Sequence, residues 1–497
     1  MPKLTIDNQP VEVPQGATIL DAAEKLGIEI PTMCFMKSCT PSTSCMVCVV
    51  KVNNANSLVP SCGTKAVDGM KVQSQTPEIS QARKAAVELL LSDHIGDCMG
   101  PCHVTCPAKM NIPLMIRQIA ENDMPGAIKT VKKDIAIPAV LGRICPAPCE
   151  NACRRKQHDS PVSICLLKRI AADTDLESKT PFVPQCDPSR NKTVAVIGSG
   201  PVGLTAAYYL QESGFDCIVY DRNEKVGGML RKEPADKLPA EVLDSEIKMV
   251  EKLGVNFKLQ TEIQDSDITK LQNEYDAVLL ATGIGRQQGF DTSSPAIFDA
   301  SDPNGKPKTA VLATAAGKDA CAKIIQYFDD LEITGSPKPF NSRMGKLKEG
   351  EIDIFMSAAK KTTRKEPQKK GDGLTQKQAI EESLRCLHCD CRKPDNCKLR
   401  KYAEQYLAKA NTYKGERRNF IWYIDHPEII VEPGKCIDCG LCIQITAKNR
   451  DALGLAFSGR GFDVNVKVPF DKSLVEAFGD AAGECVKACP TGAISWK

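Results

Sequence analysis

Residues 192–230 read KTVAVIGSGPVGLTAAYYLQESGFDCIVYDRNEKVGGML, and this stretch decides the fold of the middle of the chain. Its apolar run 194–197 predicts a strand that leads through a glycine-rich turn into a helix, and residues 217–220 predict a second strand. Glycines at the G-x-G-x-x-G spacing let the backbone approach a pyrophosphate at the helix N-terminus. Asp221, which follows the second strand, has the carboxylate that accepts ribose hydroxyls. The stretch therefore predicts a Rossmann-like βαβ unit that binds a dinucleotide.

Cysteine is the most informative residue in the rest of the chain. The 497-residue sequence has 24 cysteines, and 21 of them fall in four fields at 34–62, 98–165, 386–397 and 436–489. Structural cysteines would not gather in this way, and a long chain without a secretory signal is not expected to rely on disulfides. Thiolates at such short spacings favour iron–sulfur clusters or zinc.

Charge and hydropathy exclude other classes of protein. The net charge is +3 with 26% charged residues, so the overall charge favours neither nucleic acid nor a membrane surface. We find no apolar run long enough to span a bilayer, and the N-terminus lacks the basic and apolar regions of a signal peptide. We therefore expect a cytoplasmic protein with no membrane insertion and no nucleic-acid partner.

The first cysteine field follows a stretch that predicts strand, turn, strand and a short helix, with Thr18 and Asp21 at capping-box spacing. A [2Fe–2S] cluster needs four thiolates on a loop and a return strand, and this order supplies Cys34, Cys45, Cys48 and Cys62. The spacing resembles the N-terminal ferredoxin domain of the large iron–sulfur subunit of respiratory complex I and of iron-only hydrogenases, which implies a β-grasp fold. Cys39 is an alternative first ligand, and zinc is an alternative metal.

The second field contains CMGPCHVTCPAKMNIP and GRICPAPCENACRRKQHDSPVSIC. These segments resemble the N-terminal helical domain of the glutamate synthase small-subunit family, which is shared with dihydropyrimidine dehydrogenase. The resemblance implies two [4Fe–4S] clusters with interleaved ligands. It assigns Cys98, Cys102 and Cys153 to one cluster, and Cys106, Cys145 and Cys149 to the other.

Each of these sets lacks a fourth ligand, because the chain departs from the family here. For the first set, His94 gives the His-x3-Cys arrangement that complex I uses for a histidine-ligated cluster. The alternative is a histidine that faces solvent or only contacts the ligands. For the second set, the family has Gln or Glu where this chain has Lys168, whose ammonium is a poor iron ligand. We expect Cys165, nearly one helical turn earlier, to replace it; otherwise Cys165 is a small buried apolar residue.

The dinucleotide unit resembles the FAD site of the same glutamate synthase family. The resemblance includes a trailing Gly-Gly pair, an Ala-Thr-Gly strand end, and a Ser-Asp pair in place of the family's closing Gly-Asp. It implies FAD contacts from Gly198, Gly200, Gly203, Asp221, Gly227, Gly228, Thr282, Gly283 and Asp302. The family inserts an NADPH domain between the last two segments, but only the seventeen residues 284–300 separate them here. A βαβ unit needs roughly thirty residues, so we expect no nicotinamide site in this chain.

Residues 341–375 are basic, polar and broken by glycine, and we expect them to be partly extended, with solvated charges, within a linker over 336–375. The third cysteine field then brings four thiolates within twelve residues: Cys386, Cys389, Cys391 and Cys397. We expect them to enclose one [4Fe–4S] cluster, with zinc as the alternative.

The last field begins with Cys436, Cys439 and Cys442 at C-x2-C-x2-C spacing, but Thr446 stands where a bacterial ferredoxin has its fourth cysteine. In a two-cluster ferredoxin that fourth cysteine serves the other cluster, whose own first two ligands are also absent here. Cys489 remains to complete the first set, and Cys485 is then an orphan. We therefore expect a ferredoxin-like domain with one [4Fe–4S] cluster.

These segments together predict a multidomain α+β and α/β protein. The expected domains are a β-grasp [2Fe–2S] domain at 1–92, a helical double-cluster domain at 93–190, a Rossmann-like FAD domain at 191–335, the linker at 336–375, a cysteine-rich segment at 376–425 and the ferredoxin-like domain at 426–497. The expected cofactors are FAD, one [2Fe–2S] cluster and about four [4Fe–4S] clusters. No nucleophile–base pair indicates a catalytic side chain.

This inventory favours an electron-transfer subunit of a multi-subunit NAD(H)- or ferredoxin-linked oxidoreductase, either electron-bifurcating or not, that passes electrons between clusters and FAD. Its expected partners are an NADH-dehydrogenase-type flavoprotein subunit or ferredoxin, and a catalytic hydrogenase, dehydrogenase or reductase subunit. Two other interpretations stay open. One is a stand-alone NAD(P)H-dependent glutamate synthase-like small subunit, and the other is a docking scaffold with a redox-silent flavin.

Overall fold

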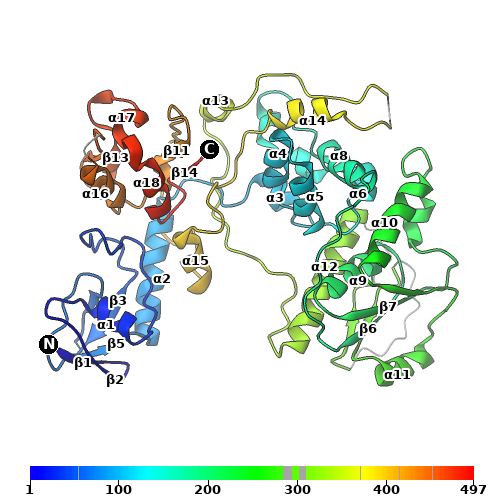
Figure 1. Ribbon diagram of the computed structural model, residues 1–497, viewed down its shortest axis with the longest axis horizontal. Helices are drawn as coiled ribbons and strands as arrows, with labels where there is room; N and C mark the ends of the chain where they lie inside the picture. The colour runs from blue at the N-terminus through cyan, green and yellow to red at the C-terminus, as the bar shows by residue number, and fades with distance from the viewer. Residues whose placement is uncertain (54, 284–293, 302–308, 370, 414, 450–451) are drawn as a thin grey trace. The chain divides into compact units, whose positions relative to one another are not determined.

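The computed structural model describes residues 1–497 except 54, 284–293, 302–308, 370, 414 and 450–451 (Figure 1). The chain divides into two compact units. The first unit consists of Met1–Met99, Pro339–Ala358 and Asp390–Lys497, and the second of Gly100–Lys338 and Ala359–Cys389. The predicted linker, the predicted cysteine-rich segment and the predicted helical domain, of which residues 93–99 lie in the first unit, are therefore each divided between the two units. The predicted domain boundaries stay predictions. None of the described helices is both long and apolar enough to cross a membrane.

A mixed five-stranded sheet forms the N-terminal part of the first unit (Figure 1). Its strands are β1 (Lys3–Ile6), β2 (Gln9–Glu12), β3 (Val49–Val52), β4 (Leu58–Pro60) and β5 (Lys71–Gln73), in the order β2-β1-β5-β3-β4. β1 is parallel to β5, and the other pairs are antiparallel. Helix α1 (Ile19–Lys25) begins at a reciprocal cap, in which the Asp21 amide donates to the Thr18 hydroxyl and the Thr18 amide donates to the Asp21 carboxylate. The predicted capping box is confirmed.

The rest of the first unit packs short elements around an apolar core that includes several cysteines. These elements are α2 (Pro77–Ser92), α13 (Glu351–Met356), α15 (Lys398–Gln405), β11 (Ile429–Val431), α16 (Leu441–Lys448), β12 (Ala456–Ser458), β13 (Asn465–Lys467), α17 (Leu474–Phe478), α18 (Ala482–Ala488) and β14 (Ile494–Trp496). β11 and β14 pair antiparallel, and α16 packs against α18. The core contains Ile429, Leu441 and Phe478, each 2% exposed or less.

Short helices make up the N-terminal part of the second unit. They are α3 (Pro101–Thr105), α4 (Ile112–Ala120), α5 (Met124–Lys132), α6 (Pro138–Ile144), α7 (Pro148–Asn151) and α8 (Ile164–Leu176), and α14 (Gln376–Ser383) packs on α4 and α8. Each helix from α3 to α7 has proline in its first turn, where the fixed φ favours helix and no amide donor is lost. Helices α3 and α6 end at Cys106 and Cys145, which are both extended. The helix ends therefore present thiols to one another.

A five-stranded parallel sheet forms the other part of the second unit (Figure 1). Its strands are β6 (Thr193–Ile197), β7 (Asp216–Tyr220), β8 (Asn256–Lys258), β9 (Ala277–Leu280) and β10 (Ile297–Asp299), in the order β10-β9-β6-β7-β8. Its helices are α9 (Pro201–Glu212), α10 (Ala240–Lys252), α11 (Asp265–Glu274) and α12 (Ala310–Phe328). The predicted strand–helix–strand over 194–220 is confirmed. Gly317 lets α12 cross α9 closely, because a Cβ there would lie 2.5 Å from the Val202 carbonyl oxygen.

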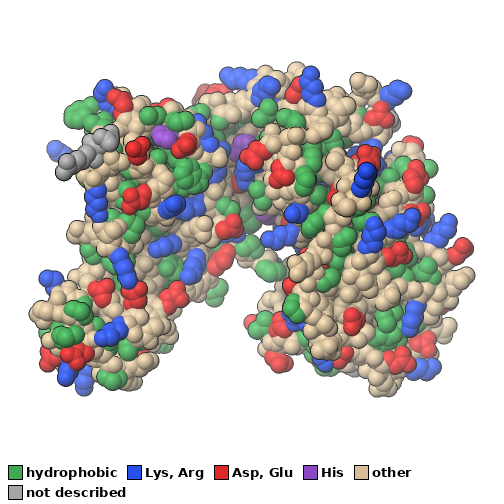
Figure 2. Space-filling model, in the orientation of Figure 1, with side chains coloured by type: hydrophobic (Ala, Val, Ile, Leu, Met, Phe, Trp, Pro, Cys, Tyr) green, Lys and Arg blue, Asp and Glu red, His purple; other side chains and the backbone are tan. Residues whose placement is uncertain are grey.

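The predicted linker is not wholly a free tether, because residues 339–358 belong to the first unit and residues 359–375 to the second. Phe355 is 4% exposed and stacks on Phe420 with ring centroids 4.6 Å apart. Glu351 is 2% exposed and forms a two-point ion pair with Arg417. This ion pair and the buried aromatic ring anchor α13, whereas Lys346, Lys360 and Lys361 are exposed. Elsewhere on the surface, Lys and Arg are interspersed with Asp and Glu over the face in Figure 2, in keeping with the small net charge.

Candidate cofactor and iron–sulfur sites

The glycine-rich turn between β6 and α9 is so tight that a side chain fits poorly at two of its three glycines. Gly198 has φ +108°, and a Cβ on Gly203 would lie 1.9 Å from the Gly198 carbonyl oxygen. A Cβ on Gly200, by contrast, would meet no atom within 4 Å. Gly200 is the N-cap of α9, and within the described part of the chain no side chain caps the first amides of that helix. Free amides and open space at a helix N-terminus fit the phosphates of a nucleotide.

Asp221 follows β7, and both of its carboxylate oxygens are occupied. Oδ2 accepts from the Ser199 amide at 2.8 Å and the Ser199 hydroxyl at 2.5 Å, while Oδ1 accepts from the Asn223 amide at 2.8 Å and the Asn223 side-chain amide at 2.7 Å. Burial raises the pKa of Asp221, but these hydrogen bonds outweigh it and hold the pKa below its usual range. An ionised carboxylate has about four acceptor positions, so a ribose hydroxyl would have to displace one of these donors. The motif does not single out Ser199, although Ser199 lies between its first two glycines.

The predicted strand end after β9 lies against the glycine turn. A Cβ on Gly198 would be 2.5 Å from the Ala281 carbonyl oxygen. The Thr282 hydroxyl is 3.2 Å from the hydroxyl of Ser301, so the strand end and the closing segment meet. Asp302, the weakest member of the predicted set, lies outside the described residues.

Two further predicted glycines reach the same turn. A Cβ on Gly228 would lie 2.9 Å from the Cα of Gly200, and the Gly227 amide donates to the Ser199 carbonyl at 3.1 Å. Gly283 has φ +75°, and a Cβ there would meet no atom within 4 Å. All predicted nucleotide-binding residues in the described part of the chain therefore belong to the turn or to the segments that follow β7 and β9.

The first set of thiols converges in the N-terminal sheet region. Cys34, Cys45, Cys48 and Cys62 are each 5% exposed or less. Side-chain hydrogen bonds join Cys34 to Cys45 and Cys62, and Cys48 to Cys62. The contact with Cys62 lowers the pKa of Cys48 to about 6, against the effect of burial. Cys39, the alternative ligand, is also buried, and its amide donates to the Met36 carbonyl.

A second set lines one small cavity among α3, α6, α7 and α8. The cavity brings together Cys106, Cys145, Cys149 and Cys165, with Lys168 beside them. A hydrogen bond from the Cys165 side chain lowers the pKa of Cys145 to about 6. Burial lowers the pKa of Lys168, but the four thiols outweigh it and raise that pKa above its usual value. A buried ammonium beside four thiols would stabilise the negative charge of a thiolate-ligated cluster in this cavity.

A third set lines a cavity of about 340 Å³ in the C-terminal region. Cys436, Cys439, Cys442 and Cys489 all face it. Cys485 is fully buried behind this set, with its sulfur 3.9 Å from the Cys442 carbonyl oxygen. Among the described residues, no three His, Cys, Asp or Glu side chains are spaced for a single metal ion.

The structure divides the remaining predicted ligands differently from the sequence prediction. Cys386 and Cys389 belong to the second unit, whereas Cys391 and Cys397 belong to the first. Burial, followed by repulsion from Cys386, Cys389 and Cys153, raises the pKa of Cys102. In the first unit, burial followed by repulsion from Cys391 and Cys98 raises the pKa of Cys397 to about 12. Each half of the third field thus has neighbours from the second field.

His94 lies just after α2 in the first unit, and its amide donates to the Leu91 carbonyl at 3.2 Å. Its Nδ1 atom is buried and has no hydrogen-bond partner among the described residues. Burial, and then the ammonium of Lys435, lowers the pKa of His94 to about 3. The imidazole is therefore neutral at physiological pH.

Three family models match successive parts of the chain. A 2Fe-2S iron-sulfur cluster binding domain matches residues 2–77, and the dihydropyrimidine dehydrogenase domain II, 4Fe-4S cluster, matches residues 80–180. An NAD(P)-binding Rossmann-like domain matches residues 196–253. The chain is thus a multidomain protein with a 2Fe–2S domain, a helical 4Fe–4S domain and a Rossmann-like domain.

Three curated relatives are similar to part of the chain. The beta subunit of an NADPH-Fe(3+) oxidoreductase of Geobacter sulfurreducens is 36% identical over 192 residues, which is 38% of this chain and 29% of the relative. The PreT subunit of the NAD-dependent dihydropyrimidine dehydrogenase of Salmonella typhimurium is 35% identical, over 38% of this chain and 47% of the relative. The beta subunit of an NADP(+)-dependent formate dehydrogenase of Moorella thermoacetica is 35% identical, over 37% of this chain and 29% of the relative. The match covers less than half the length of each.

Proposed function

We propose that the chain is an iron–sulfur flavoprotein that transfers electrons within a multi-subunit oxidoreductase. The observation that carries the proposal is that one chain combines three converging sets of four thiols with a glycine turn shaped for a nucleotide. The matched 2Fe–2S and 4Fe–4S domains support cluster binding. All three relatives are named as subunits of oxidoreductases, which supports a role beside a catalytic partner.

The nucleotide of this proposal is FAD. Gly200 leaves open space at the N-terminus of α9, and Thr282 and Gly283 follow the neighbouring strand. When bound there, a flavin supplies the exchange between two-electron and one-electron chemistry. The chain's own residues would bind the pyrophosphate through the amides of α9 and orient the ribose through Asp221.

The short connection between β9 and β10 argues against an inserted nicotinamide domain. β9 and β10 pair directly in parallel, with Ile297 opposite Val278. The connection between them covers residues 281–296, which is shorter than the roughly thirty residues of a βαβ unit. In this proposal NAD(H) binds to an NADH-dehydrogenase-type partner subunit, or reduced ferredoxin delivers electrons, and the terminal substrate binds to a catalytic partner.

A second candidate has support of its own. The family model that matches residues 196–253 describes an NAD(P)-binding Rossmann-like domain, so the glycine turn could hold NAD(P)H directly. The chain would then accept hydride itself, and its clusters would carry the electrons onward. The geometry of the turn fits the phosphates of either nucleotide.

Cofactor analysis of the purified chain tests the proposal. We expect anaerobically purified protein to release one FAD per chain on denaturation, and to contain about 18 irons if one [2Fe–2S] and four [4Fe–4S] clusters are built. Release of NAD(H) or NADP(H) in place of FAD would favour the second candidate. A colourless protein without iron would overturn both.

A further inference from the structure

The four cysteines of the third field do not belong to one compact body. The chain passes from the second unit to the first between Cys389 and Asp390. Cys386 and Cys389 therefore lie before that boundary, and Cys391 and Cys397 lie after it. The surroundings of each pair decide which cluster it serves.

In the first unit, Cys391 lies beside Cys98. The Cys391 amide donates to the Cys98 carbonyl at 3.4 Å, and the preceding residues, Asp97 and Asp390, form a parallel bridge. The Cys98 sulfur accepts a hydrogen bond from the Ser342 amide at 3.4 Å. Amide donors to sulfur are what a thiolate ligand needs, because they stabilise its negative charge.

The remaining members of this set come from two helix ends. Cys397 is the N-cap of α15 and interacts electrostatically with both Cys98 and Cys391. His94 follows α2, and its buried Nδ1 has no partner among the described residues. An unpaired buried nitrogen costs free energy unless a ligand uses it, and an imidazole nitrogen is an established iron ligand in Rieske centres.

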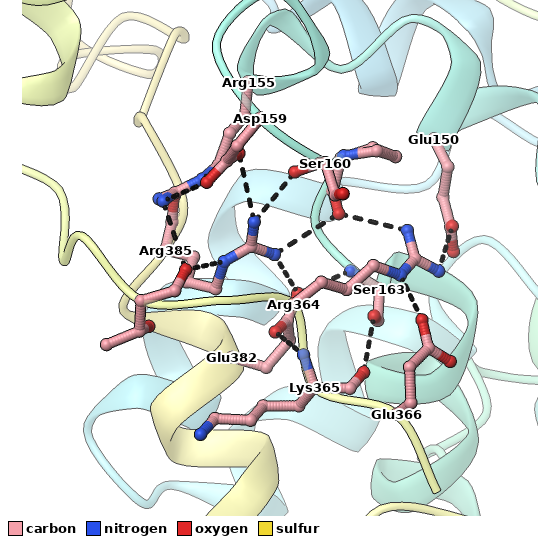
Figure 3. Close-up of polar contacts among 12 residues, drawn as sticks. Glu150, Arg155, Asp159, Ser160, Ser163, Arg364, Lys365, Glu366, Glu382 and Arg385 are labelled. Carbon is pink, nitrogen blue, oxygen red and sulfur yellow. Dashed lines mark hydrogen bonds and ion pairs between the residues drawn. The ribbon is translucent and has the colours of Figure 1, made fainter.

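In the second unit, a buried polar network links the segment that follows Cys153 to the segment that precedes Cys386; Figure 3 shows its members Arg155, Arg385 and Glu382. Arg155, two residues after Cys153, is fully buried and donates to the carbonyl of Arg385 at 2.6 Å. Arg385 is also fully buried and pairs with Glu382 at 2.7 Å. The segment that carries Cys386 is therefore fixed to the segment that carries Cys153.

The same network links Arg364 and Lys365, in the segment where the chain re-enters the second unit, to residues 150 and 163 near the start of α8. Glu382 accepts from the Ser163 amide at 2.9 Å and from the Lys365 amide at 2.7 Å (Figure 3). Arg364 pairs with Glu150 at 2.9 Å. Cys102 interacts electrostatically with Cys153, Cys386 and Cys389 and completes the group.

We propose that the third field serves two [4Fe–4S] clusters, two ligands to each. One cluster, in the first unit, is held by His94, Cys98, Cys391 and Cys397. The other, in the second unit, is held by Cys102, Cys153, Cys386 and Cys389. This grouping replaces the two groupings expected from sequence, and it uses the same eight side chains. It rests on the proposed function only in assuming that these side chains bind clusters.

Iron counts of paired variants separate the two groupings. We expect Cys98→Ala and Cys391→Ala each to lose about four irons, and the double variant to lose about four as well, because both ligands serve one cluster. The double variant Cys386→Ala with Cys391→Ala should lose about eight. Cys485→Ala is the matched control and should retain the full count. A [2Fe–2S] electron paramagnetic resonance signal unchanged in every variant shows that the chain has folded.

The reverse pattern would overturn the grouping. If the third field held one cluster, the Cys386–Cys391 pair would lose about four irons and the Cys98–Cys391 pair about eight. Zinc bound to the third field would overturn it as well. Wild-type protein without iron, by contrast, would contradict the proposed function before any grouping could be compared.

The histidine ligand has a test in the unmodified protein, which does not depend on variants folding. The chain has five histidines, and growth on ¹⁵N-histidine labels only these. We expect pulsed paramagnetic resonance of the reduced protein to show ¹⁵N coupling to one [4Fe–4S] cluster. The coupling should disappear in His94→Ala and persist in His388→Ala. Wild-type protein without such a coupling, or a coupling that survives His94→Ala, would contradict the proposal.

Discussion

Thr446 stands where the spacing of a bacterial ferredoxin has a cysteine, and its side chain is hydrogen-bonded within the protein core. Its side chain is fully buried, and its hydroxyl donates to the Cys442 carbonyl at 2.9 Å and accepts from the Leu455 amide at 3.2 Å. Thr446 is therefore a satisfied core residue of α16. Cys489, at the end of α18, lines the same cavity as Cys436, Cys439 and Cys442, and in the proposed function it is the fourth ligand of their cluster.

Cys489→Ser should damage the C-terminal cluster, because Cys489 lines the cavity with the other three thiols. We expect a loss of about four irons and of one [4Fe–4S] signal in paramagnetic resonance. Cys485→Ser is the matched control, since Cys485 is on the same helix but does not line that cavity. Equal iron loss in both variants would contradict this ligand assignment.

The nucleotide turn allows a second comparison at the residue scale. Gly200→Ala adds a methyl group where no atom lies within 4 Å, so we expect stability to change by less than about 0.5 kcal/mol. The same methyl group obstructs the approach of a pyrophosphate, and bound nucleotide should fall roughly tenfold or more. Nucleotide content and thermal unfolding measure the two effects.

Gly203→Ala is the contrasting variant, because its Cβ would lie 1.9 Å from the Gly198 carbonyl oxygen. We expect it to destabilise the fold by about 1–3 kcal/mol as well as to lose nucleotide. Normal nucleotide content in Gly200→Ala would show that the ligand does not bind at this turn.

At the scale of elements, the structure differs most from the sequence prediction in the segment between the Rossmann sheet and the third cysteine field. Helix α13 is short, but it buries Phe355 and Met356 and anchors Glu351 to Arg417. A basic, glycine-containing sequence gives little sign of this, because the partners that neutralise its charges lie far away in the chain.

The docking of α13 should depend on pH. Burial raises the pKa of Glu351, but Arg417 and the amides of Phe420 and Lys348 outweigh it and hold that pKa at about 2. A carboxylate whose pKa falls on folding stabilises the protein above its unfolded pKa and loses that contribution as pH falls through its folded pKa. The contribution should be roughly 2–3 kcal/mol at pH 7 and should be lost between about pH 4.5 and pH 2.

Trp422 reports on this docking, since its ring packs against Phe355 and Phe420. Denaturant unfolding followed by tryptophan fluorescence should show Glu351→Gln to be less stable than wild type at pH 7, with the difference shrinking as the pH falls below about 4.5. Glu349→Gln, on an exposed neighbour, should match wild type throughout. A Glu351→Gln protein as stable as wild type at pH 7 would contradict the account.

The sequence correctly predicted those elements whose conformation is determined by residues close together in the chain. The strand–helix–strand around Gly198 and the capping box of Thr18 and Asp21 are confirmed, because each is determined within a short stretch of chain. The convergence of Cys165 with Cys145 was expected from the family resemblance together with the helical spacing of Cys165 and Lys168, and both thiols line one cavity. The neighbours of Cys391 could not be predicted in this way, because Cys98 is about three hundred residues away in the sequence. Ser199 and Asn223, which donate hydrogen bonds to Asp221, were not predicted, because neither residue is part of a recognised nucleotide-binding motif.

At the scale of the whole molecule, the chain comprises two compact units, each with its own sets of cysteines, and the second also has the nucleotide turn. In the proposed function the second unit holds FAD and two clusters, and the first holds three clusters. Electrons would enter and leave through partner subunits, since the connection between β9 and β10, residues 281–296, is too short for an inserted nicotinamide domain.

Anaerobic reduction of the isolated holoprotein tests this central claim most directly. The visible absorption of flavin and clusters would be followed after mixing with NADH, with NADPH, or with a reduced low-potential ferredoxin. We predict rapid bleaching by reduced ferredoxin and none by either nicotinamide nucleotide until a partner subunit is added. Rapid bleaching by NADH or NADPH alone would contradict the account and would place the nicotinamide site in this chain.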